Sequence, residues 1–324
     1  MPLVSVIIPS YNHEKYVSEA IESVLNQTFE DIELIIIDDA SKDKSKEIIK
    51  YYEKKDSRVL AVFHNENKGI ARTMNEGIER ASGKFLSLFS SDDVWVEDKL
   101  KKQLEILKEN ENLVVWSEGL IIDNQGNFTG ERVSQRHGPY KRKKSGNIFS
   151  ELLKGNYICD LSAIFKRENI KNIKYDEKLK YLNDYKFMVD LAKRYEFYFI
   201  AEPLVRYRIH GKNTVLSDKI HWRKDDIMIG NYFLREYGSE ISNKTKCLIF
   251  LNIGNAYSFI GEKTKAKKNY YQAIKYNPFF WIDLYALIIF LTNRSGIIYD
   301  FLNLSYKYYQ KIKNRLTKNK IMII

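Results

Sequence analysis

The chain has 324 residues, 44% of them hydrophobic, which suits one large folded domain with or without an appendage and excludes a disordered chain. Its formal net charge is +11, yet residues 1–218 carry 35 basic and 35 acidic side chains, whereas residues 219–324 carry 18 and 7. Because the body of the chain has no basic excess, we expect no nucleic-acid partner.

The opening residues predict a strand. Residues 1–8 contain no basic segment and run directly into Pro9, which argues against a signal peptide. The longest apolar run, residues 279–292, contains Asp283 and is too short to span a membrane. Cys159 and Cys247 lie too far apart for a paired-cysteine metal motif. We expect both to be thiols in a reducing, cytoplasmic compartment.

Short β-branched runs alternate with stretches of helical spacing over residues 4–110. The expected strands are Val4–Ile8, Ile32–Ile37, Val59–Phe63 and Lys84–Phe89. The expected helices are Glu14–Asn26, Lys42–Glu53, Ile70–Arg80 and Val96–Asn110. This order predicts an α/β fold with a mostly parallel sheet flanked by helices, in which ligands bind beyond the carboxyl ends of the strands.

Polar residues follow three of these strands where each one ends. They are Pro9-Ser10-Tyr11-Asn12, Asp38-Asp39-Ala40-Ser41 and Ser90-Ser91-Asp92-Asp93. Four carboxylates at one sheet edge would repel one another without a cation or a hydrogen-bonding ligand between them. Oxygen ligands of this kind suit Mg²⁺ or Mn²⁺. Asp92 or Asp93 alone would fit equally well as the N-cap of the helix that continues through Lys99.

The pattern changes further along the chain. Residues 123–147 lose regular spacing, and order returns at Ile148–Leu153. After residue 240 the sequence predicts helices, with a spacing that resembles one tetratricopeptide repeat. The residues that carry this spacing are Phe250, Gly254, Tyr257, Ala266, Tyr270, Ala273 and Pro278. A single repeat fits a helical hairpin packed on the main domain better than a partner-binding array, which needs about three repeats.

Several motifs in this order resemble glycosyltransferase family 2. Besides the strand ends, they are Ser23–Thr28, Glu33, Lys42-Asp43, Gly69–Gly77 with Arg72 and Asn75, and Ala81–Gly83. The resemblance covers about residues 1–215 and implies a GT-A (Rossmann-like) fold and a nucleotide-sugar donor. We therefore expect a catalytic domain over residues 1–218, with a nucleotide-binding half (1–117) and an acceptor half (118–218). Residues 219–324 would form a basic, all-α extension.

The resemblance also implies a role for each matching residue. Tyr11 would pack on the nucleotide base, and Asp39 would accept a hydrogen bond from the uracil imide, supported by Asp38. Asp92 would meet the ribose, and Asp93 would bind the Mn²⁺ or Mg²⁺ that bridges the two phosphates. The remaining nucleotide-binding residues would be Pro9, Asn12 and Arg72. A surface ion pair is the ordinary alternative for Arg72.

Asp184 is the expected catalytic base. Relatives commonly have Glu-Asp where this chain has Asn183-Asp184, so one neighbouring charge is missing. In an inverting displacement, a carboxylate opposite the leaving group removes the proton of the acceptor hydroxyl. The alternative for Asp184 is a helix N-cap.

Two further positions bear on the metal. Ser90 stands where many relatives have Asp, which leaves Asp93 as the main metal carboxylate. His210 matches the family's Tyr-Arg-x-His segment, which implies that it approaches the metal or the diphosphate. An isolated histidine also fits a structural role.

The last residues predict a basic amphipathic helix. The apolar positions are Phe301, Leu304, Tyr308, Ile312 and Leu316, with Lys307, Lys311, Lys313 and Arg315 on other faces. Such a helix packs into a protein core or lies peripherally on an anionic membrane, here on its cytoplasmic face.

The sequence as a whole predicts an enzyme of the hexosyltransferase type. We expect a metal-dependent, inverting transfer from a UDP-sugar to a glycan or lipid-linked acceptor in surface polysaccharide or glycoconjugate synthesis. The alternative is a degenerate nucleotide- or glycan-binding scaffold that acts through its helical tail.

Overall fold

The computed structural model describes residues 1–136, 143–211 and 218–277. They belong to two compact units, residues 1–219 and the residues from 220 onward. The apolar run at 279–292 and the basic helix expected at 300–316 lie outside the described residues. Within the described residues, no helix is both long and apolar enough to cross a membrane.

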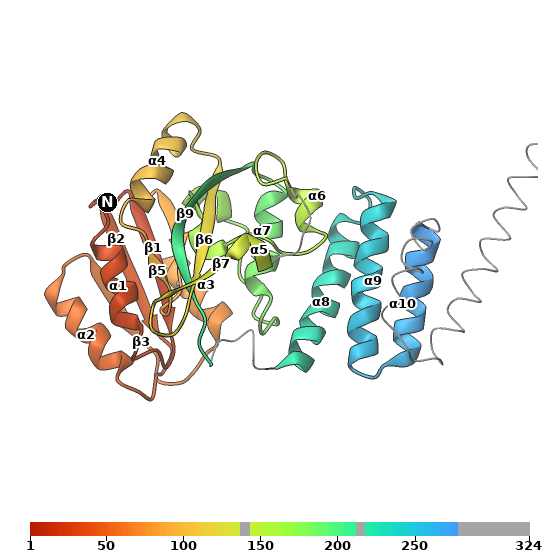
Figure 1. Ribbon diagram of the computed structural model, residues 1–324, viewed down its shortest axis with the longest axis horizontal. Helices are drawn as coiled ribbons and strands as arrows, with labels where there is room; N and C mark the ends of the chain where they lie inside the picture. Colours follow the sequence, from red (N-terminus) through yellow and green to blue (C-terminus); the bar gives the residue numbers. More distant parts are fainter. Residues whose placement is uncertain (137–142, 212–217, 278–324) are drawn as a thin grey trace, which may run out of the picture. The chain divides into compact units, whose positions relative to one another are not determined.

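A mixed sheet forms the centre of the first unit (Figure 1). Its strands are β1 (Val4–Ser10), β2 (Ile32–Asp38), β3 (Val59–Phe63), β4 (Phe85–Leu88), β5 (Val94–Trp95), β6 (Val114–Ile122), β7 (Phe128–Arg132), β8 (Ile164–Lys166) and β9 (Phe197–Arg208). Their order is β3-β2-β1-β4-β8-β6-β9-β5, with β7 paired to β6. The first four strands are parallel, and β8 pairs antiparallel with β4 and β6. The predicted α/β fold is confirmed.

Helices flank this sheet (Figure 1). They are α1 (Val17–Leu25), α2 (Ser45–Lys55), α3 (Ile70–Arg80), α4 (Lys99–Glu109), α5 (Val133–Arg136), α6 (Phe149–Leu152) and α7 (Asn183–Ala192), with 3₁₀ turns at Asp160–Ser162 and Arg167–Ile170. α3 has the predicted bounds and packs closely on β1, because a Cβ atom at Gly77 would overlap the Ile7 side chain. The absence of a side chain at Gly77 therefore lets this helix approach the sheet.

Three helices begin later than the spacing predicts, at Val17, Ser45 and Lys99. Before α2, the backbone N–H of Lys42 donates to Asn12 Oδ1 at 2.8 Å, so this residue serves a loop. Before α4, the backbone N–H of Val96 donates to Leu204 O at 2.9 Å, which extends the contact with β9. If these two helices began earlier, the N–H groups of Lys42 and Val96 would lie in the first turn and have no partner within the helix. Hydrogen bonds to distant segments satisfy them instead.

The segment predicted to be irregular, residues 123–147, contains β7 and α5. All five residues of β7 are exposed, so no buried face gives the sequence an alternating pattern. The expectation of an irregular segment was wrong here for that reason. Near the end of this segment, Trp116 of β6 donates from Nε1 to the Lys144 carbonyl at 3.0 Å, which holds this part of the segment against the sheet.

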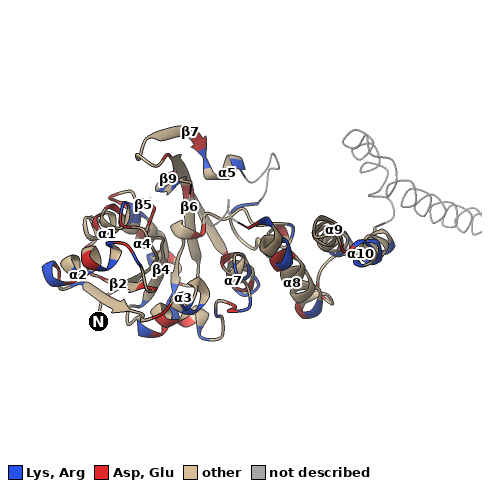
Figure 2. Ribbon diagram, turned by 90° about the horizontal axis from the view of Figure 1, so that it is seen from below, with Lys and Arg blue, Asp and Glu red and all other residues tan. Residues whose placement is uncertain are grey.

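The second unit contains α8 (Lys219–Tyr237), α9 (Asn243–Phe259) and α10 (Lys263–Tyr276). Ser242 caps α9 by accepting the Thr245 N–H at 3.1 Å. α9 and α10 pack as a hairpin, in which a Cβ atom at Gly254 would lie 2.6 Å from the Tyr270 ring. α10 carries basic side chains and no acidic one (Figure 2). The resemblance to a tetratricopeptide repeat stays a prediction.

Candidate active site

The carboxyl ends of β1, β2 and β3 meet at one edge of the sheet. Ser10 pairs with Asp38 in the β1–β2 register. The N–H of Asp39 donates to Ser10 O at 2.8 Å, and the N–H of His64 donates to Asp38 O at 2.9 Å. The loops that follow the three strands therefore start next to one another. This arrangement includes the predicted segments Pro9–Asn12 and Asp38-Asp39.

Asn12 ties the first two of these loops together. Its N–H donates to Ser41 Oγ at 2.9 Å, and its Oδ1 accepts the Lys42 N–H at 2.8 Å. Asn12 (φ 56°) and Ala40 (φ 63°) both adopt the left-handed backbone conformation. Asn tolerates this conformation, whereas it costs Ala about 1–2 kcal/mol. The strained residue adjoins Asp39, and strain of this kind persists where surrounding contacts fix the backbone.

Asp39 is buried among hydrogen-bond donors. Its Oδ1 accepts the Lys68 N–H at 2.8 Å and lies 2.7 Å from His64 Nδ1, while its Oδ2 accepts the Gly69 N–H at 2.9 Å. His64 Nε2 lies 3.0 Å from Glu76 Oε2 on α3. Asp39 thus fixes the loop before α3, and His64 links it to that helix. We did not predict a role for His64. It directly follows β3, so the expectation that ligands bind beyond the carboxyl ends of the strands could have identified it.

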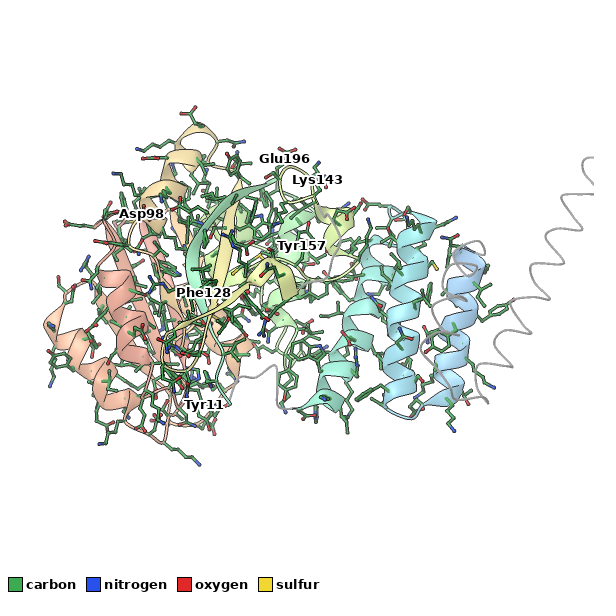
Figure 3. The ribbon with its side chains drawn as sticks, viewed as in Figure 1. Tyr11, Asp98, Phe128, Lys143, Tyr157 and Glu196 are labelled. Carbon is green, nitrogen blue, oxygen red and sulfur yellow. The ribbon has the colours of Figure 1, made fainter. Side chains whose placement is uncertain are left out.

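The other predicted nucleotide-binding residues surround this point. Asp38 Oδ1 accepts the Ser41 N–H at 3.0 Å, whereas Asp38 Oδ2 and Ser10 Oγ are buried without a hydrogen-bond partner among the described residues. Buried polar atoms of this kind favour a bound polar partner. Tyr11 is 42% exposed (Figure 3), and Arg72 is exposed in the first turn of α3.

Asp92 and Asp93 lie between β4 and β5. Neither is an N-cap of α4, because β5 intervenes and the cap position of α4 is Asp98. Asp93 is 1% exposed, and its Oδ1 accepts the Arg208 N–H at 2.7 Å. Burial, together with the charge of Asp92, raises the pKa of Asp93 well above its ordinary value. A nearby cation would oppose this effect.

Asp92 lies beside two histidines. Its Oδ2 is 3.0 Å from His210 Nε2, and His13 Nδ1 is 2.7 Å from Ser91 Oγ. His13, Asp92 and His210 each offer a ligand atom within 4.8 Å of the other two. Nitrogen and carboxylate donors at such distances suit a divalent transition metal. The predicted residue His210 therefore lies among side chains that could hold a metal ion. Asp92, which was predicted to meet the ribose, belongs to this group, whereas Asp93 does not.

Arg208 connects the end of β9 to the Asp92-Asp93 segment. This buried side chain donates from Nε to Asp92 O at 2.8 Å, and its guanidinium forms an ion pair with Glu19 on α1. Its backbone N–H holds Asp93, as described above. His210 follows Arg208 by two residues. Arg208 therefore helps to position both Asp92 and His210 in the group of His13, Asp92 and His210, called the histidine–aspartate group below.

Asp184 lies in the first turn of α7. It is not the N-cap, which is Leu182, although its Oδ1 accepts the Tyr185 N–H at 2.6 Å. Burial and the nearby charge of Asp160 raise the pKa of Asp184 to about 8. Burial raises the pKa of Asp160 itself to about 6, and its charge also acts on Asp93. Asp160 starts a 3₁₀ turn, and no motif in the sequence points to it.

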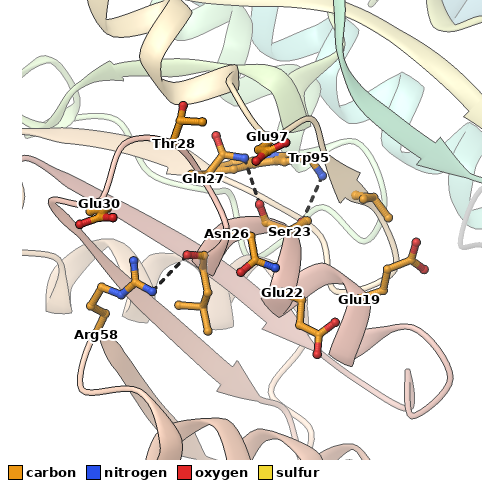
Figure 4. A pocket seen from close by; sticks show the side chains of 12 residues that line it. Glu19, Glu22, Ser23, Asn26, Gln27, Thr28, Glu30, Arg58, Trp95 and Glu97 are labelled. Carbon is orange, nitrogen blue, oxygen red and sulfur yellow. Dashed lines mark hydrogen bonds between the residues drawn. The ribbon is translucent and has the colours of Figure 1, made fainter.

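An open cleft of about 990 Å³ is lined by residues of α1 and β5, among others (Figure 4). Its lining includes Glu19, Glu22, Glu30, Arg58 and Glu97, and none of the predicted site residues. Arg58, labelled in Figure 4, donates from Nη2 to the Leu25 carbonyl at 3.1 Å. Two of its lining residues adjoin the site: Glu19 forms an ion pair with Arg208, and Val94 directly follows Asp93 in the chain.

Comparisons with known proteins identify the family that this chain resembles. The sequence model described as Glycosyl transferase family 2 matches residues 5–174. An uncharacterized glycosyltransferase of Methanocaldococcus jannaschii is 32% identical over 72% of this chain and 83% of its own length. TuaG of Bacillus subtilis, whose name assigns it to teichuronic acid biosynthesis, is 32% identical over 67% of this chain and 83% of its own.

Solved structures share the fold at lower identity. Staphylococcus aureus TarS (residues 1–349), solved with UDP-GlcNAc, has a TM-score of 0.61 at 19% identity, over 84% of this chain and 79% of that one. The mannosyltransferase PcManGT of Pyrobaculum calidifontis, solved with GDP-Man and Mn²⁺, has a TM-score of 0.56 at 15% identity, over 98% of this chain and 88% of that one.

Proposed function

The chain belongs to glycosyltransferase family 2, and from its site we propose that it transfers a sugar from a UDP-sugar to a hydroxyl group of a glycan or lipid-linked acceptor. One observation carries the proposal: the end of β1, with Ser10 and Tyr11, lies beside the end of β2, with Asp38 and Asp39, at one edge of a GT-A fold. The name of TuaG supports an acceptor in surface polysaccharide synthesis. We place the reaction in the cytoplasm, at the membrane face where the acceptor is lipid-linked.

The nucleotide base would bind between Tyr11 and Asp39. An exposed aromatic ring supplies a flat apolar surface for a base. A carboxylate accepts about four hydrogen bonds, and Asp39 Oδ2 accepts one from Gly69 N–H. A second acceptor position on this oxygen suits the N–H of a uracil imide. Pro9, Asn12, Asp38 and Arg72 would complete this part of the site.

The diphosphate would bind near Asp92 and His210, whose donor atoms fit a divalent cation. When bound, Mn²⁺ or Mg²⁺ would stabilise the negative charge that develops on the departing nucleoside diphosphate. Asp93 stays a predicted ligand. Its burial and raised pKa mean that its negative charge is held at a cost, which a cation next to it would lower.

Asp184 would remove the proton of the acceptor hydroxyl. A base works best when its pKa lies near the working pH, and the pKa of Asp184 is about 8. Attack from the face opposite the leaving group inverts the anomeric carbon. The substitution of Asn for Glu at position 183 leaves this role of Asp184 unchanged.

Release of nucleotide from a panel of UDP- and GDP-sugars tests the proposal. The full chain is incubated with each donor and Mn²⁺, with and without a membrane extract that supplies acceptor. We expect release from at least one UDP-sugar, and we expect Asp93→Asn to remove the metal-dependent part. UDP binding without release from any donor would instead support the degenerate scaffold.

A further inference from the structure

His13 lies one residue beyond the loop motif that follows β1, and no role in nucleotide binding accounts for its position. Its backbone is fixed at both ends. The N–H donates to Ser45 Oγ at 3.0 Å, and the carbonyl accepts the N–H groups of Tyr16 and Val17 at 2.9 Å. The His13 imidazole is thereby anchored at the N-terminal end of α1, facing the segment that carries Asp92.

The His13 ring is oriented as well as anchored. Its Nδ1 lies 2.7 Å from Ser91 Oγ, and its edge contacts the His210 ring at 5.7 Å between centroids, with an interplanar angle of 81°. Tyr16 stacks on His210 at 4.9 Å. A hydrogen bond from one ring nitrogen and contacts that fix the ring plane are the features that position a metal-binding histidine.

From this arrangement we infer that His13 is a direct ligand of the divalent cation and that it makes the site selective for Mn²⁺ over Mg²⁺. The ligand atoms of His13, Asp92 and His210 lie within 4.8 Å of one another. Transition metals bind such atoms at about 2.0–2.2 Å, so two ligands of one ion are at most about 4.4 Å apart. One pair, His210 Nε2 and Asp92 Oδ2, is already 3.0 Å apart, so rotation of the His13 side chain toward this pair would bring all three ligand atoms to one ion.

The selectivity follows from the donor atoms. Mg²⁺ takes oxygen ligands and keeps several waters, so it gains little from an imidazole. An imidazole nitrogen adds more to the binding of a transition metal than to that of Mg²⁺, and the affinity increases from Mn²⁺ through Fe²⁺ to Co²⁺. A pair of aspartates with one histidine would distinguish these ions poorly. The second histidine, His13, tips the donor set from oxygen toward nitrogen.

Mn²⁺ binding to the full-length protein, measured by the loss of the electron paramagnetic resonance signal of free Mn²⁺, tests the inference without substrate. We expect His13→Ala to raise the dissociation constant for Mn²⁺ at least tenfold. The constant for Mg²⁺, measured by competition, should change less than about threefold, because oxygen ligands dominate its binding. His221→Ala is the matched control, since it removes an exposed imidazole from the second unit.

A second variant guards against loss of folding. His13→Asn keeps a polar side chain at this position, and thermal unfolding without metal reports whether either variant is folded. A folded His13→Ala or His13→Asn protein that binds Mn²⁺ as tightly as the wild type would overturn the inference. A wild-type protein that prefers Mg²⁺ would overturn it too.

The inference rests on the proposed function only in assuming that the bound cation serves sugar transfer. Metal binding by His13 and sugar transfer can therefore fail separately. If Mn²⁺ binding depends on His13 but no nucleotide sugar is cleaved, the ligand assignment holds and the proposed transfer fails. If a UDP-sugar is cleaved but Mn²⁺ binding is the same with and without His13, the transfer holds and the ligand assignment fails.

Discussion

Asp39 and Asp93 are both buried aspartates at strand ends, yet their surroundings differ. Asp39 is contacted by two backbone N–H groups and by His64. Asp93 accepts hydrogen bonds from the Arg208 N–H and the Ser90 side chain, but burial and the carboxylates of Asp92 and Asp160 raise its pKa. In the half of the site that would bind the base, the protein itself supplies hydrogen-bond donors to the carboxylate. In the half that would bind phosphate, stabilisation depends on what binds there.

The largest expected effect concerns Asp184, in the half where carboxylates gather. Asp184→Asn should lower the rate of sugar transfer by about 10²–10⁴-fold, because a positioned general base contributes that much. The dissociation constant for UDP, measured by calorimetry, should stay within twofold. Glu196→Gln, at an exposed position (Figure 3), is the control and should retain full activity. Equal activity of the two variants would remove Asp184 from the reaction.

The pH dependence should show the next largest effect. Because the base must be deprotonated, kcat/KM should rise about tenfold per pH unit up to an inflection near pH 8, the pKa of Asp184. Asp160→Asn removes a negative charge that raises this pKa, so the inflection should move to lower pH. A pH–rate profile of both proteins checks this. An unmoved inflection would show that Asp160 has no influence on the base.

The same raised pKa has a consequence for stability. The folded protein holds the Asp184 proton up to about pH 8, whereas the unfolded chain releases it near pH 4. The folded state therefore binds more protons between these values, and this group's contribution to the free energy of unfolding falls as pH rises from about 4 to 8.

His64 tests the other half of the site. His64→Ala removes a hydrogen-bonding partner of Asp39, and we expect UDP affinity to fall about three- to tenfold, as for one lost hydrogen bond. Mn²⁺ binding without nucleotide should be unchanged, because His64 contacts Asp39 and Glu76, which lie in the half of the site that would bind the base. A loss of both affinities would mean that the halves are not independent.

Ala40 gives the smallest effect. Ala40→Gly relieves the left-handed strain but adds freedom to the unfolded chain, so we expect a net gain of about 0.5–1 kcal/mol in the free energy of unfolding. Urea denaturation measures this gain. A destabilised variant would show that the Ala40 side chain contributes more through packing than its backbone conformation costs.

The strands β1 to β4 and the aspartates at their ends could be predicted from the sequence, because both depend on local sequence patterns. The strands β1 to β4 are short apolar runs, and α3 has the predicted bounds because Gly69 precedes it and its buried face is regular. The rule that ligands bind beyond strand ends located Asp38, Asp39, Asp92 and Asp93. Local pattern and general topology suffice for these residues.

The rest of the site depends on contacts between distant segments. Asp160 gains its role from a 3₁₀ turn that packs near Asp93 and Asp184, and the residues around it form no periodic pattern. His13 joins a group that could hold a metal ion only when β9 brings His210 to Asp92. His64 could have been predicted from the sequence, because it directly follows β3 as Asp39 directly follows β2.

The long-range bonds of Arg208 and His210 have a consequence for how the chain folds. Arg208 pairs with a residue 189 positions earlier, and His210 meets Asp92 across 118 positions. The parallel strands β1 to β4 can pair soon after they leave the ribosome, because their partners are near in sequence. The histidine–aspartate group cannot exist until β9 has been synthesised and docked. A nascent chain would therefore complete the sheet edge proposed to bind the nucleotide well before the side chains proposed to bind the metal ion come together.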